Sequence, residues 1–373
     1  MLSDIYLQSL KELMVQLKTP LYEEHVKLSA TISNFAGWSM PIVYESTIKE
    51  HLSVRKSAGV FDVSHMARIL VKGPDSANLL QKLVAKNIEK AKEGRMLGPT
   101  AFLNEKGGFI DDIMVYKLSE KEFLIVGNAV NREKDVNWIK RFAEGLEVEI
   151  ADLTFEIAMI ALQGPDSSKI MKKLSSNNIE DLDFLHFKKD AEVAGVKSFL
   201  VSRSGWTGED GYEIMVPSNY ASKVWSALIE AGATPCGLAA RDSLRIEMGY
   251  CLYGEDIDEN ITPLEARYWV FTFNKPPYIG YKALLKKYEE GVDKIRVGIK
   301  LKERTVPRRG HKIYMGETCV GEITSGTFSP VLNCGIGIAY IDSKHALIGA
   351  PVVVDIRGKK RKAKIVDFPF ITK

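Results

Sequence analysis

The chain has 373 residues, of which 45% are hydrophobic and 27% are charged, and its formal net charge at neutral pH is +3. These proportions are ordinary for a globular protein, and a chain of this length can bury a large core without disulfides or metals. Such a small net charge gives no reason to expect a nucleic-acid partner. At about 150 residues per domain, two or three domains are predicted.

Cysteines and histidines are few and show no metal-site spacing. The four cysteines form no CxxC pair, and the six histidines are scattered, so free thiols in a reducing, cytoplasmic location and no bound metal are expected. No run of about 18 apolar residues is present, and the N-terminus lacks the apolar core of a signal peptide. Neither a membrane nor a nucleic acid is therefore expected as a partner.

The first sixty residues are predicted to contain two helices and an aromatic loop. Apolar residues recur at near-helical spacing over 2–17, which predicts an amphipathic helix docked on the body of the protein. The segment 35–42 is aromatic, contains a proline and is not periodic, so a buried loop is expected. A second helix is predicted over 47–57.

Asp62, Ser64 and His65 are the residue types of a catalytic triad, but they lie too close together in the sequence. Neighbours on a strand point to opposite faces and cannot form a hydrogen-bonded relay. A structural role is therefore favoured for all three. Met66 is a better pocket candidate, because thioethers make adaptable walls for flat ligands.

Two adjacent aspartates stand near the start of a strand predicted over 109–117, directly after a glycine pair that permits a tight turn. Because side chains alternate along a strand, Asp111 and Asp112 must point in opposite directions, and Asp112 shares its face with Met114 and Tyr116. Buried carboxylates are costly unless they are paired. One of the two is expected to face a pocket while the other caps a turn or meets solvent. The alternative is that both simply close the turn.

The chain contains two similar stretches. Gly-Pro-Asp-Ser occurs at 73–76 and again at 164–167, each time after an apolar run and before a helical pattern. Further on, Asp-Ile-Met-Val at 112–115 matches Glu-Ile-Met-Val at 213–216. We infer a duplicated strand–helix–strand–strand unit, with chance similarity of the helix starts as the alternative. In a duplication, Asp112 and Glu213 would occupy equivalent positions and face a shared cavity.

The two units are predicted from alternating and helical patterns of apolar residues. The first has strands over 68–72, 98–103, 109–117 and 122–128, and helices over 74–85 and 131–143. The second has strands over 156–162, 197–203 and 212–216, and helices over 165–174, 219–231 and 237–248.

Two residues of the second unit are candidate ligand contacts. Trp206 lies in a glycine-bounded loop, where its ring can stack on a planar heterocycle or serve in packing. Arg241 lies in the otherwise small and apolar first turn of the helix over 237–248, so partial burial is expected. A buried guanidinium needs a carboxylate or carbonyl partner, and pairing within the protein or with a ligand both remain open.

The part of the chain after a proline-containing break at 274–280 is rich in strands. Following a helix over 281–288, strands are predicted over 294–301, 311–315, 318–323, 335–341, 351–356 and 361–366, which suggests a small antiparallel barrel or sandwich. The basic run at 357–362 is interpreted as a solvated hairpin turn rather than a phosphate site. Phosphate-loop, zinc-protease and nucleophile-elbow motifs are absent.

These stretches together resemble the T-protein of the glycine cleavage system, a tetrahydrofolate-dependent aminomethyltransferase. The matching segments run in family order over about 19–370 and include Gly-Trp-Ser-Met-Pro at 37–41, Phe-Asp-Val-Ser-His-Met at 61–66 and Gly-Trp-Thr-Gly-Glu at 205–209. The others lie at 19–22, 107–116, 236–238, 252–254 and 323–330. The resemblance covers nearly the whole chain except the predicted N-terminal helix.

The resemblance implies an α+β fold, a three-domain cloverleaf around a central folate cavity. Two related α/β lobes with antiparallel sheets would be joined by a C-terminal antiparallel β-barrel. The expected units are 1–60, with the N-terminal helix and part of lobe 1; 61–150, lobe 2 with the aspartate pair; 151–275, the remainder of lobe 1 with Glu213 and Arg241; and 280–373, the barrel.

The family's catalytic aspartate corresponds to Asp112, and its pterin-binding glutamate to Glu213. A carboxylate beside the folate N5 can orient that nucleophile and stabilise developing iminium charge. The acceptor would be tetrahydrofolate or a modified tetrahydropterin, and the donor the aminomethyl group on the lipoylated H-protein, with release of ammonia. The other implied pocket residues are Met66, Tyr116, Asn128, Trp206 and Arg241.

Two departures bear on the pocket: Pro99 stands where the family commonly has a tyrosine, and the tail after residue 369 is short. Either can alter folate contacts or mark a preference for a modified pterin. Two other functions remain open, a folate-dependent demethylase of a small methylated donor and a folate-binding scaffold without catalysis. The reactive cysteine loop of the related iron–sulfur repair proteins is not found.

Overall fold

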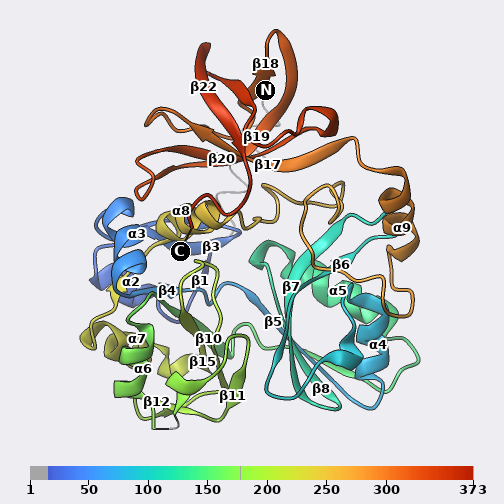
Figure 1. The fold of residues 1–373 in the computed structure, drawn as a ribbon. Helices are drawn as coiled ribbons and strands as arrows, with labels where there is room; N and C mark the ends of the chain where they lie inside the picture. Colours follow the sequence, from blue (N-terminus) through green and yellow to red (C-terminus); the bar gives the residue numbers. More distant parts are fainter. Residues whose placement is uncertain (1–15, 177, 373) are drawn as a thin grey trace, which may run out of the picture.

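The computed structural model describes residues 16–176 and 178–372, which form two sheet-and-helix lobes and a barrel arranged around a common centre (Figure 1). Lobe 1 contains a six-stranded sheet in the order β11-β14-β15-β10-β4-β16, antiparallel except where β16 joins β4. Its strands are β4 (Gly59–Asp62), β10 (Ile157–Gln163), β11 (Phe187–Lys189), β14 (Leu200–Ser202), β15 (Gly211–Pro217) and β16 (Thr234–Pro235).

Lobe 2 contains a five-stranded antiparallel sheet in the order β6-β7-β8-β5-β9. Its strands are β5 (Ala67–Lys72), β6 (Met96–Leu103), β7 (Phe109–Ser119), β8 (Glu122–Gly127) and β9 (Glu149–Asp152). All five match the predicted ranges within a few residues, apart from the short β9, which was not predicted.

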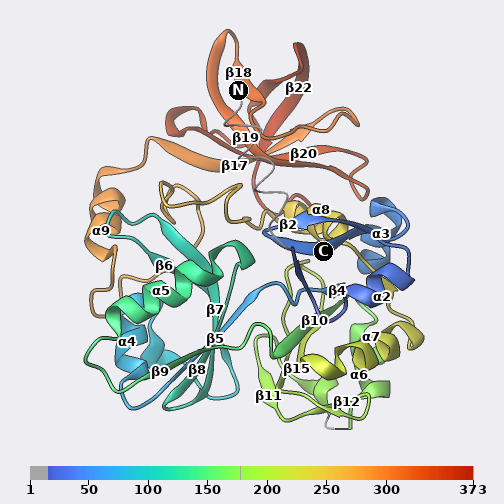
Figure 2. The ribbon, with the colours of Figure 1, turned by 180° about the vertical axis from the view of Figure 1, so that it is seen from behind.

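The two sheets pack face to face, with helices on their outer sides. On β10, Ile160 and Leu162 join the core beneath helices α6 (Ser167–Leu174) and α7 (Ala221–Glu230). Met159 and Ala161, which point to the other face of β10, join a second core, shared with Tyr116 and Val126 of lobe 2. Helices α4 (Ser76–Leu83) and α5 (Arg132–Phe142) cover the outer face of lobe 2, so α4 and α7 lie on opposite sides of the molecule (Figure 2).

The repeated Gly-Pro-Asp-Ser segments adopt the same backbone conformation, in agreement with a duplication. The two glycines have φ of 138° at Gly73 and 135° at Gly164. The two aspartates that precede the helices have φ of −93° in both copies. Gly73 needs its lack of a side chain, because a Cβ there would lie 2.2 Å from the backbone oxygen of Glu147.

The expected equivalence of Asp112 and Glu213 is wrong, however. Residues 72 and 163 end the matching strands β5 and β10, and their partners across the sheet are residues 122 and 211. Two positions further along, Glu213 corresponds to Leu124 on β8, whereas Asp112 lies on β7, one strand further out. The segments 112–115 and 213–216 look alike because different strands of a sheet can share the same apolar pattern, although they do not occupy equivalent positions.

The N-terminal part differs from the prediction, most clearly at residues 35–42. The predicted loop at 35–42 is a hairpin, in which β2 (Thr31–Phe35) pairs with β3 (Trp38–Val43) through a turn at positive φ. A proline is tolerated at position 41 because the register between β2 and β3 shifts next to it. On its other side, β3 pairs with β1 (Leu17–Lys18) only at residues 38 and 39. The predicted helix over 2–17 lies almost wholly outside the described residues, and its last position, Leu17, begins β1.

Of the remaining elements, the helices α3 (Thr47–Lys56), α8 (Leu238–Met248) and α9 (Tyr281–Glu290) were predicted. The short helix α2 (Tyr22–Lys27), and the hairpin of β12 (Glu192–Val193) and β13 (Val196–Lys197) at the edge of lobe 1, were not predicted. The barrel closes in the order β17-β20-β19-β18-β21-β22. Its strands are β17 (Lys294–Leu301), β18 (Lys312–Met315), β19 (Thr318–Ser329), β20 (Cys334–Asp342), β21 (Pro351–Ile356) and β22 (Lys359–Val366).

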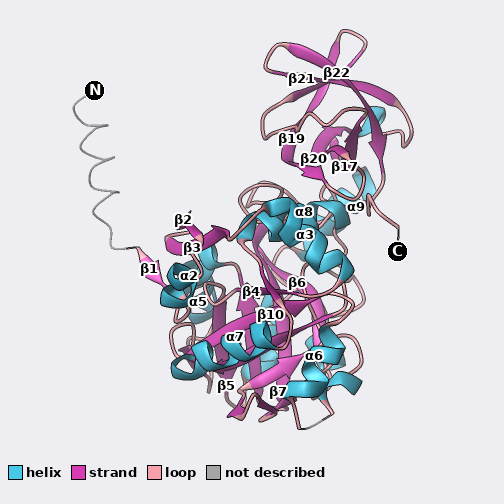
Figure 3. Ribbon diagram, turned by 90° about the vertical axis from the view of Figure 1, so that its left-hand side faces the viewer, coloured by secondary structure: helices cyan, strands magenta, loops and turns pink. Residues whose placement is uncertain are grey.

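Helix α8 is placed where lobe 1 meets the barrel, as Figure 3 shows from the side. The basic run at 357–362 forms the exposed turn between β21 and β22, as predicted. All four cysteines are free. Among the described helices, none has the length and apolar character needed to cross a membrane.

Candidate active site

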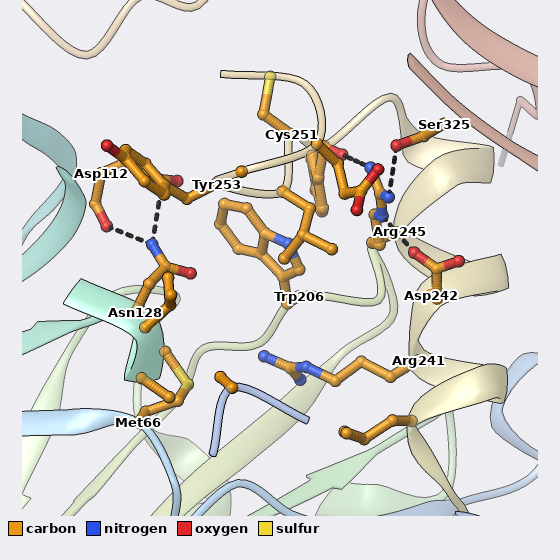
Figure 4. A pocket seen from close by; sticks show the side chains of 18 of the residues that line it. Met66, Asp112, Asn128, Trp206, Arg241, Asp242, Arg245, Cys251, Tyr253 and Ser325 are labelled. Atoms are coloured by element: carbon orange, nitrogen blue, oxygen red, sulfur yellow. Dashed lines mark hydrogen bonds and ion pairs between the residues drawn. The ribbon is translucent and has the colours of Figure 1, made fainter. Parts of the chain in front are cut away.

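A cavity of about 830 Å³ opens between the two lobes and the barrel. Its walls are mainly apolar with a few converging polar groups, a composition typical of small-molecule sites. All seven residues predicted for the site line it, and Figure 4 shows five of them with their neighbours. They are Met66, Asp112, Tyr116, Asn128, Trp206, Glu213 and Arg241.

Asp112 faces this cavity from the centre of β7, on the same side of the strand as Met114 and Tyr116. Asn128, which follows β8, donates from Nδ2 to Asp112 Oδ1 over 2.8 Å. Burial, and then the negative charge of Asp111, raise the pKa of Asp112 to about 7. Asp112 can therefore both take up and release a proton near neutral pH.

Asp111 points to the opposite face, as strand geometry requires, but it neither meets solvent nor caps the preceding glycine turn. It is fully buried beneath α5. Its carboxylate accepts hydrogen bonds from the backbone and side chain of Asn128 and from the side chain of Asn131. The expectation of an exposed partner was wrong because α5 packs over this end of the sheet.

Glu213 projects from β15 into the same cavity. Its Oε2 accepts a hydrogen bond of 2.5 Å from Ser204, which lies 2.8 Å from Ser202. Ser202 lies in turn 3.5 Å from the hydroxyl of Tyr116. A chain of hydroxyl groups thus links Glu213 of lobe 1 to Tyr116 of lobe 2. Burial raises the pKa of Glu213, and the hydrogen bond from Ser204 counteracts this rise.

Arg241 extends from the first turn of α8 into the cavity (Figure 4). Its Nη1 is buried and has no hydrogen-bond partner among the described residues. Burial lowers the pKa of Arg241, while the charge of Glu213 acts in the opposite direction. A buried donor without a partner is costly, so the arrangement fits a ligand that brings an acceptor.

Trp206 and Met66 supply flat and adaptable apolar surface at the cavity, which Trp206 enters near its centre in Figure 4. The Trp206 ring contacts Tyr250 at a centroid distance of 4.9 Å and an interplanar angle of 42°. Trp206 is only partly buried and Met66 is also partly accessible, so both surfaces can meet a ligand. Pro99 lines the same cavity and pairs with Met114 across the sheet.

The triad-like residues form no relay, in agreement with the sequence argument. Asp62 accepts a hydrogen bond of 2.9 Å from His25, on α2, and another from the backbone of Ser64. His65 lines the cavity and packs edge-on against Phe35 at 5.5 Å. Burial lowers the pKa of His65 to about 3, so this imidazole is neutral.

Several residues of the cavity were missed from the sequence. Cys251, Tyr253 and Tyr268 come from the segment between α8 and α9, and Arg308 and Arg309 come from the barrel. The hydroxyl of Tyr268 is buried near Asp112. These segments have no helical or strand periodicity, so the signals available in the sequence were the matching segment at 252–254 and several aromatic residues. In the described part of the chain, no group of three or more potential ligands could hold a metal ion.

Comparison with known proteins agrees with this geometry. The family model described as "GCVT N-terminal domain" matches residues 21–275, and "Glycine cleavage T-protein C-terminal barrel domain" matches residues 294–371. An aminomethyltransferase of Halothermothrix orenii is 45% identical over 363 residues, which cover 95% of this chain and 99% of that protein. A probable aminomethyltransferase of Aeropyrum pernix is 43% identical over 94% of this chain and 96% of its own length.

A solved structure supports the same assignment over nearly the whole chain. The crystal structure of the glycine cleavage system aminomethyltransferase T of Bartonella henselae superimposes with a TM-score of 0.90. It is 33% identical in sequence and covers 96% of this chain and 98% of its own. The chain therefore belongs to the glycine cleavage T-protein family and is an aminomethyltransferase, a transferase of one-carbon groups in the glycine cleavage system.

Proposed function

We propose that the central cavity binds the reduced pterin of tetrahydrofolate and that Asp112 is the catalytic carboxylate. The observation that carries this proposal is the position of Asp112: a partly buried carboxyl group with a pKa raised to about 7 faces a cavity large enough for a heterocycle. Opposite it stand the buried carboxylate of Glu213 and the guanidinium of Arg241, whose Nη1 has no hydrogen-bond partner among the described residues. Such convergent polar groups orient a polar ring in an apolar pocket.

The other lining residues have complementary roles in holding the ring. Glu213 accepts hydrogen bonds from the amino and ring N–H groups of the pterin, and such bonds to a carboxylate are strong. Arg241 donates to an acceptor on the same ligand. Met66 and Trp206 flank the ring with polarizable and aromatic surface. Asn128 and Tyr116 border the ring on the side of lobe 2.

The chemistry requires a base and a site for developing positive charge. Tetrahydrofolate supplies the nucleophilic nitrogen, and the aminomethyl group arrives on the lipoylated H-protein of the same system. As ammonia leaves, Asp112 orients the nucleophile, stabilises the developing iminium charge and takes up the proton that the nitrogen loses. Because the ionised form of Asp112 is the base, the rate should rise with pH through about 7.

The test is the substitution Asp112→Asn, which keeps the shape and the hydrogen bond to Asn128 but removes the base. Tetrahydrofolate should still bind, as measured by calorimetry, while ammonia release from aminomethyl H-protein should fall by about 10²- to 10⁴-fold. Glu133→Gln removes one exposed carboxylate from the same lobe and should behave as the wild-type protein does. Unchanged turnover in the Asp112 variant would exclude this residue as the catalytic group.

The wild-type protein can also be used to identify the acceptor and the donor of the one-carbon group. Calorimetry with tetrahydrofolate and with a modified tetrahydropterin compares the two acceptors, whose choice the changed wall at Pro99 can affect. Formation of methylated folate from a small methylated amine in the absence of H-protein would instead identify a demethylase. We expect transfer only from the lipoyl-bound aminomethyl group.

A further inference from the structure

Directly behind Asp112, two buried aspartates and two asparagines form a cluster that the reaction described above does not use in full. Asp135 lies on α5, on the outer side of the sheet, and is completely buried. Neither of its carboxylate oxygens receives a hydrogen bond from an N–H or O–H donor among the described residues. The group it faces is another carboxylate, that of Asp111.

The two carboxylates approach the same point of the backbone. A Cβ atom built on Gly127 would lie 2.7 Å from Oδ2 of Asp135 and 2.8 Å from Oδ2 of Asp111. A side chain at this position would therefore displace one or both carboxylates. Two ionised carboxylates only accept hydrogen bonds, so they can bond to each other only when one of them carries a proton.

The surrounding donors determine which of the two is ionised. Asp111 accepts three hydrogen bonds, from the backbone N–H of Asn128 at 2.8 Å, from Asn128 Nδ2 at 2.8 Å and from Asn131 Nδ2 at 2.5 Å. Hydrogen bonds of this kind favour the charged form. Asp135 has no such donors, and burial together with the charge of Asp111 raises its pKa well above the usual range. The proton therefore belongs on Asp135.

The ionised Asp111 reaches Asp112 through Asn128. The side-chain amide of Asn128 donates from Nδ2 to Oδ1 of Asp111 and to Oδ1 of Asp112, both at 2.8 Å. Because both partners are acceptors, the amide orientation is fixed, and its own oxygen points away from the acids (Figure 4). Asp111 therefore orients the side chain of Asn128, which in turn orients the carboxyl group of Asp112.

We propose that Asp111 and Asp135 form a buried acid pair that shares one proton and, through Asn128 and the remaining negative charge, fixes the orientation and proton affinity of Asp112. Both are positioning residues. The effect of this pair on catalysis depends on the catalytic role proposed above for Asp112. The sharing of the proton itself can be measured without turnover.

Other ionisable groups face this cluster from the neighbouring elements. Lys134 on α5 attracts Asp135, but its Nζ also bonds to the hydroxyl of Tyr253 at 2.7 Å and to Glu259 at 3.1 Å. Tyr268 and Cys251 face Asp112. Asp258 faces Tyr253, which stands next to the acid pair. These groups are present in every variant compared below, so a difference between variants reports on the pair.

The test compares Asp135→Asn, Asp111→Asn and the control Glu133→Gln, an exposed carboxylate two positions away on α5. The ionisation of each aspartate is followed by ¹³C NMR of aspartate-labelled full-length protein, and Asp112 is assigned from its loss in Asp112→Asn. The wild-type protein should keep one protonated aspartate at pH 9, where Asp112 is ionised. This signal should be missing in Asp135→Asn and present in the control.

The two variants should affect Asp112 differently. An asparagine at 135 replaces the proton donor by an amide donor, so the titration midpoint of Asp112 should stay near its wild-type value. Asp111→Asn removes the neighbouring charge, so the midpoint should fall by about one pH unit or more. The pH dependence of ammonia release should follow both results.

Two results would overturn the proposal. One is the absence of any protonated aspartate at pH 9 in the wild-type protein. The other is a fall of the Asp112 midpoint in Asp135→Asn as large as that expected for Asp111→Asn, because this would mean that Asp135 carries its own charge. If Asp111→Asn does not fold, the wild-type signal and Asp135→Asn decide the question alone. Failure of the catalytic assignment would appear separately, as unchanged turnover in Asp112→Asn while the shared proton persists.

Discussion

Among single residues, Glu213 is a buried carboxylate with few hydrogen bonds. Apart from Ser204, no described residue has a hydrogen bond to its side chain that meets the usual geometric limits, and its exposed fraction is only 7%. Burying a charge with so little compensation is unfavourable. A ligand that donates hydrogen bonds to the free lone pairs would offset this cost.

The prediction at this scale is that Glu213→Ala weakens tetrahydrofolate binding. Hydrogen bonds to a charged group contribute about 1.5–3 kcal/mol each, so an increase of Kd by about 10- to 100-fold is expected from one such bond. Isothermal titration calorimetry with tetrahydrofolate measures it. Glu230→Ala, at the exposed end of α7, is the matched control and should bind as the wild-type protein does. Equal affinity in the two variants would contradict the proposed contact.

At the scale of the secondary-structure elements, α2 depends on a buried hydrogen bond between His25 and Asp62. The helix has six residues, too few to be stable alone. Its His25 bonds to Asp62 of β4 at 2.9 Å and to the hydroxyl of Tyr44 at 2.8 Å. Burial opposes ionisation of Asp62, but the hydrogen bond and charge of His25 outweigh it and lower the pKa of Asp62 to about 2.

A depressed carboxyl pKa stabilises the fold above the unfolded value near 4, and the contribution is lost as the pH falls through about 2. Asp62→Asn should therefore lower the free energy of unfolding at pH 6 by about 2 kcal/mol. The deficit relative to the wild-type protein should shrink towards pH 3. Urea unfolding followed by circular dichroism measures both values, with the exposed Asp183→Asn as control. A deficit that is the same at both pH values would point to packing instead.

For the whole molecule, Arg245 of α8 makes one of the buried polar contacts between lobe 1 and the barrel. Its guanidinium donates to Asp256, to the backbone oxygen of Tyr250 and, at 2.8 Å, to Ser325 on β19 (Figure 4). Asp256 in turn accepts a hydrogen bond from Thr324 of the same barrel strand. The arginine is only 3% exposed, so its contacts are made in a dry interface between the two bodies.

Arg245→Met should leave Asp256 buried without its cation, at a cost of about 3–5 kcal/mol in the free energy of unfolding. It should also tend to separate urea unfolding into two transitions, since the barrel and the lobes would lose one of their buried polar contacts, while that of Glu247 with Ser329 remains. Arg309→Met removes an exposed pair with Glu255 and should cost less than about 1 kcal/mol. A single transition with an unchanged midpoint in Arg245→Met would show that the contacts of Arg245 do not couple the two bodies.

Sequence patterns predicted most strands and helices because periodicity is a local property, and the family resemblance predicted all seven pocket residues. Neither the patterns nor the resemblance could predict which residues that are distant in the sequence contact each other in the fold. Asp135 occupied a position within an ordinary amphipathic helix, and nothing local connects it to Asp111, 24 positions earlier. The hairpin at 31–43 was mistaken for a loop because Pro41 and aromatic residues hid its alternation. Tyr268 lies in a segment without regular structure, where only the folded chain shows what it approaches.

The offset between Glu213 and Asp112, on non-corresponding strands of the two repeats, also bears on how a substrate can be seated. A cavity with two identical halves would bind every ligand in two orientations of equal energy, related by a rotation of 180°. Here an exchange of the halves would put Leu124 where Glu213 stands. Divergence of the repeats has thus made the reversed orientation unfavourable, so that a flat, polar ligand presents the same edge to Asp112 each time.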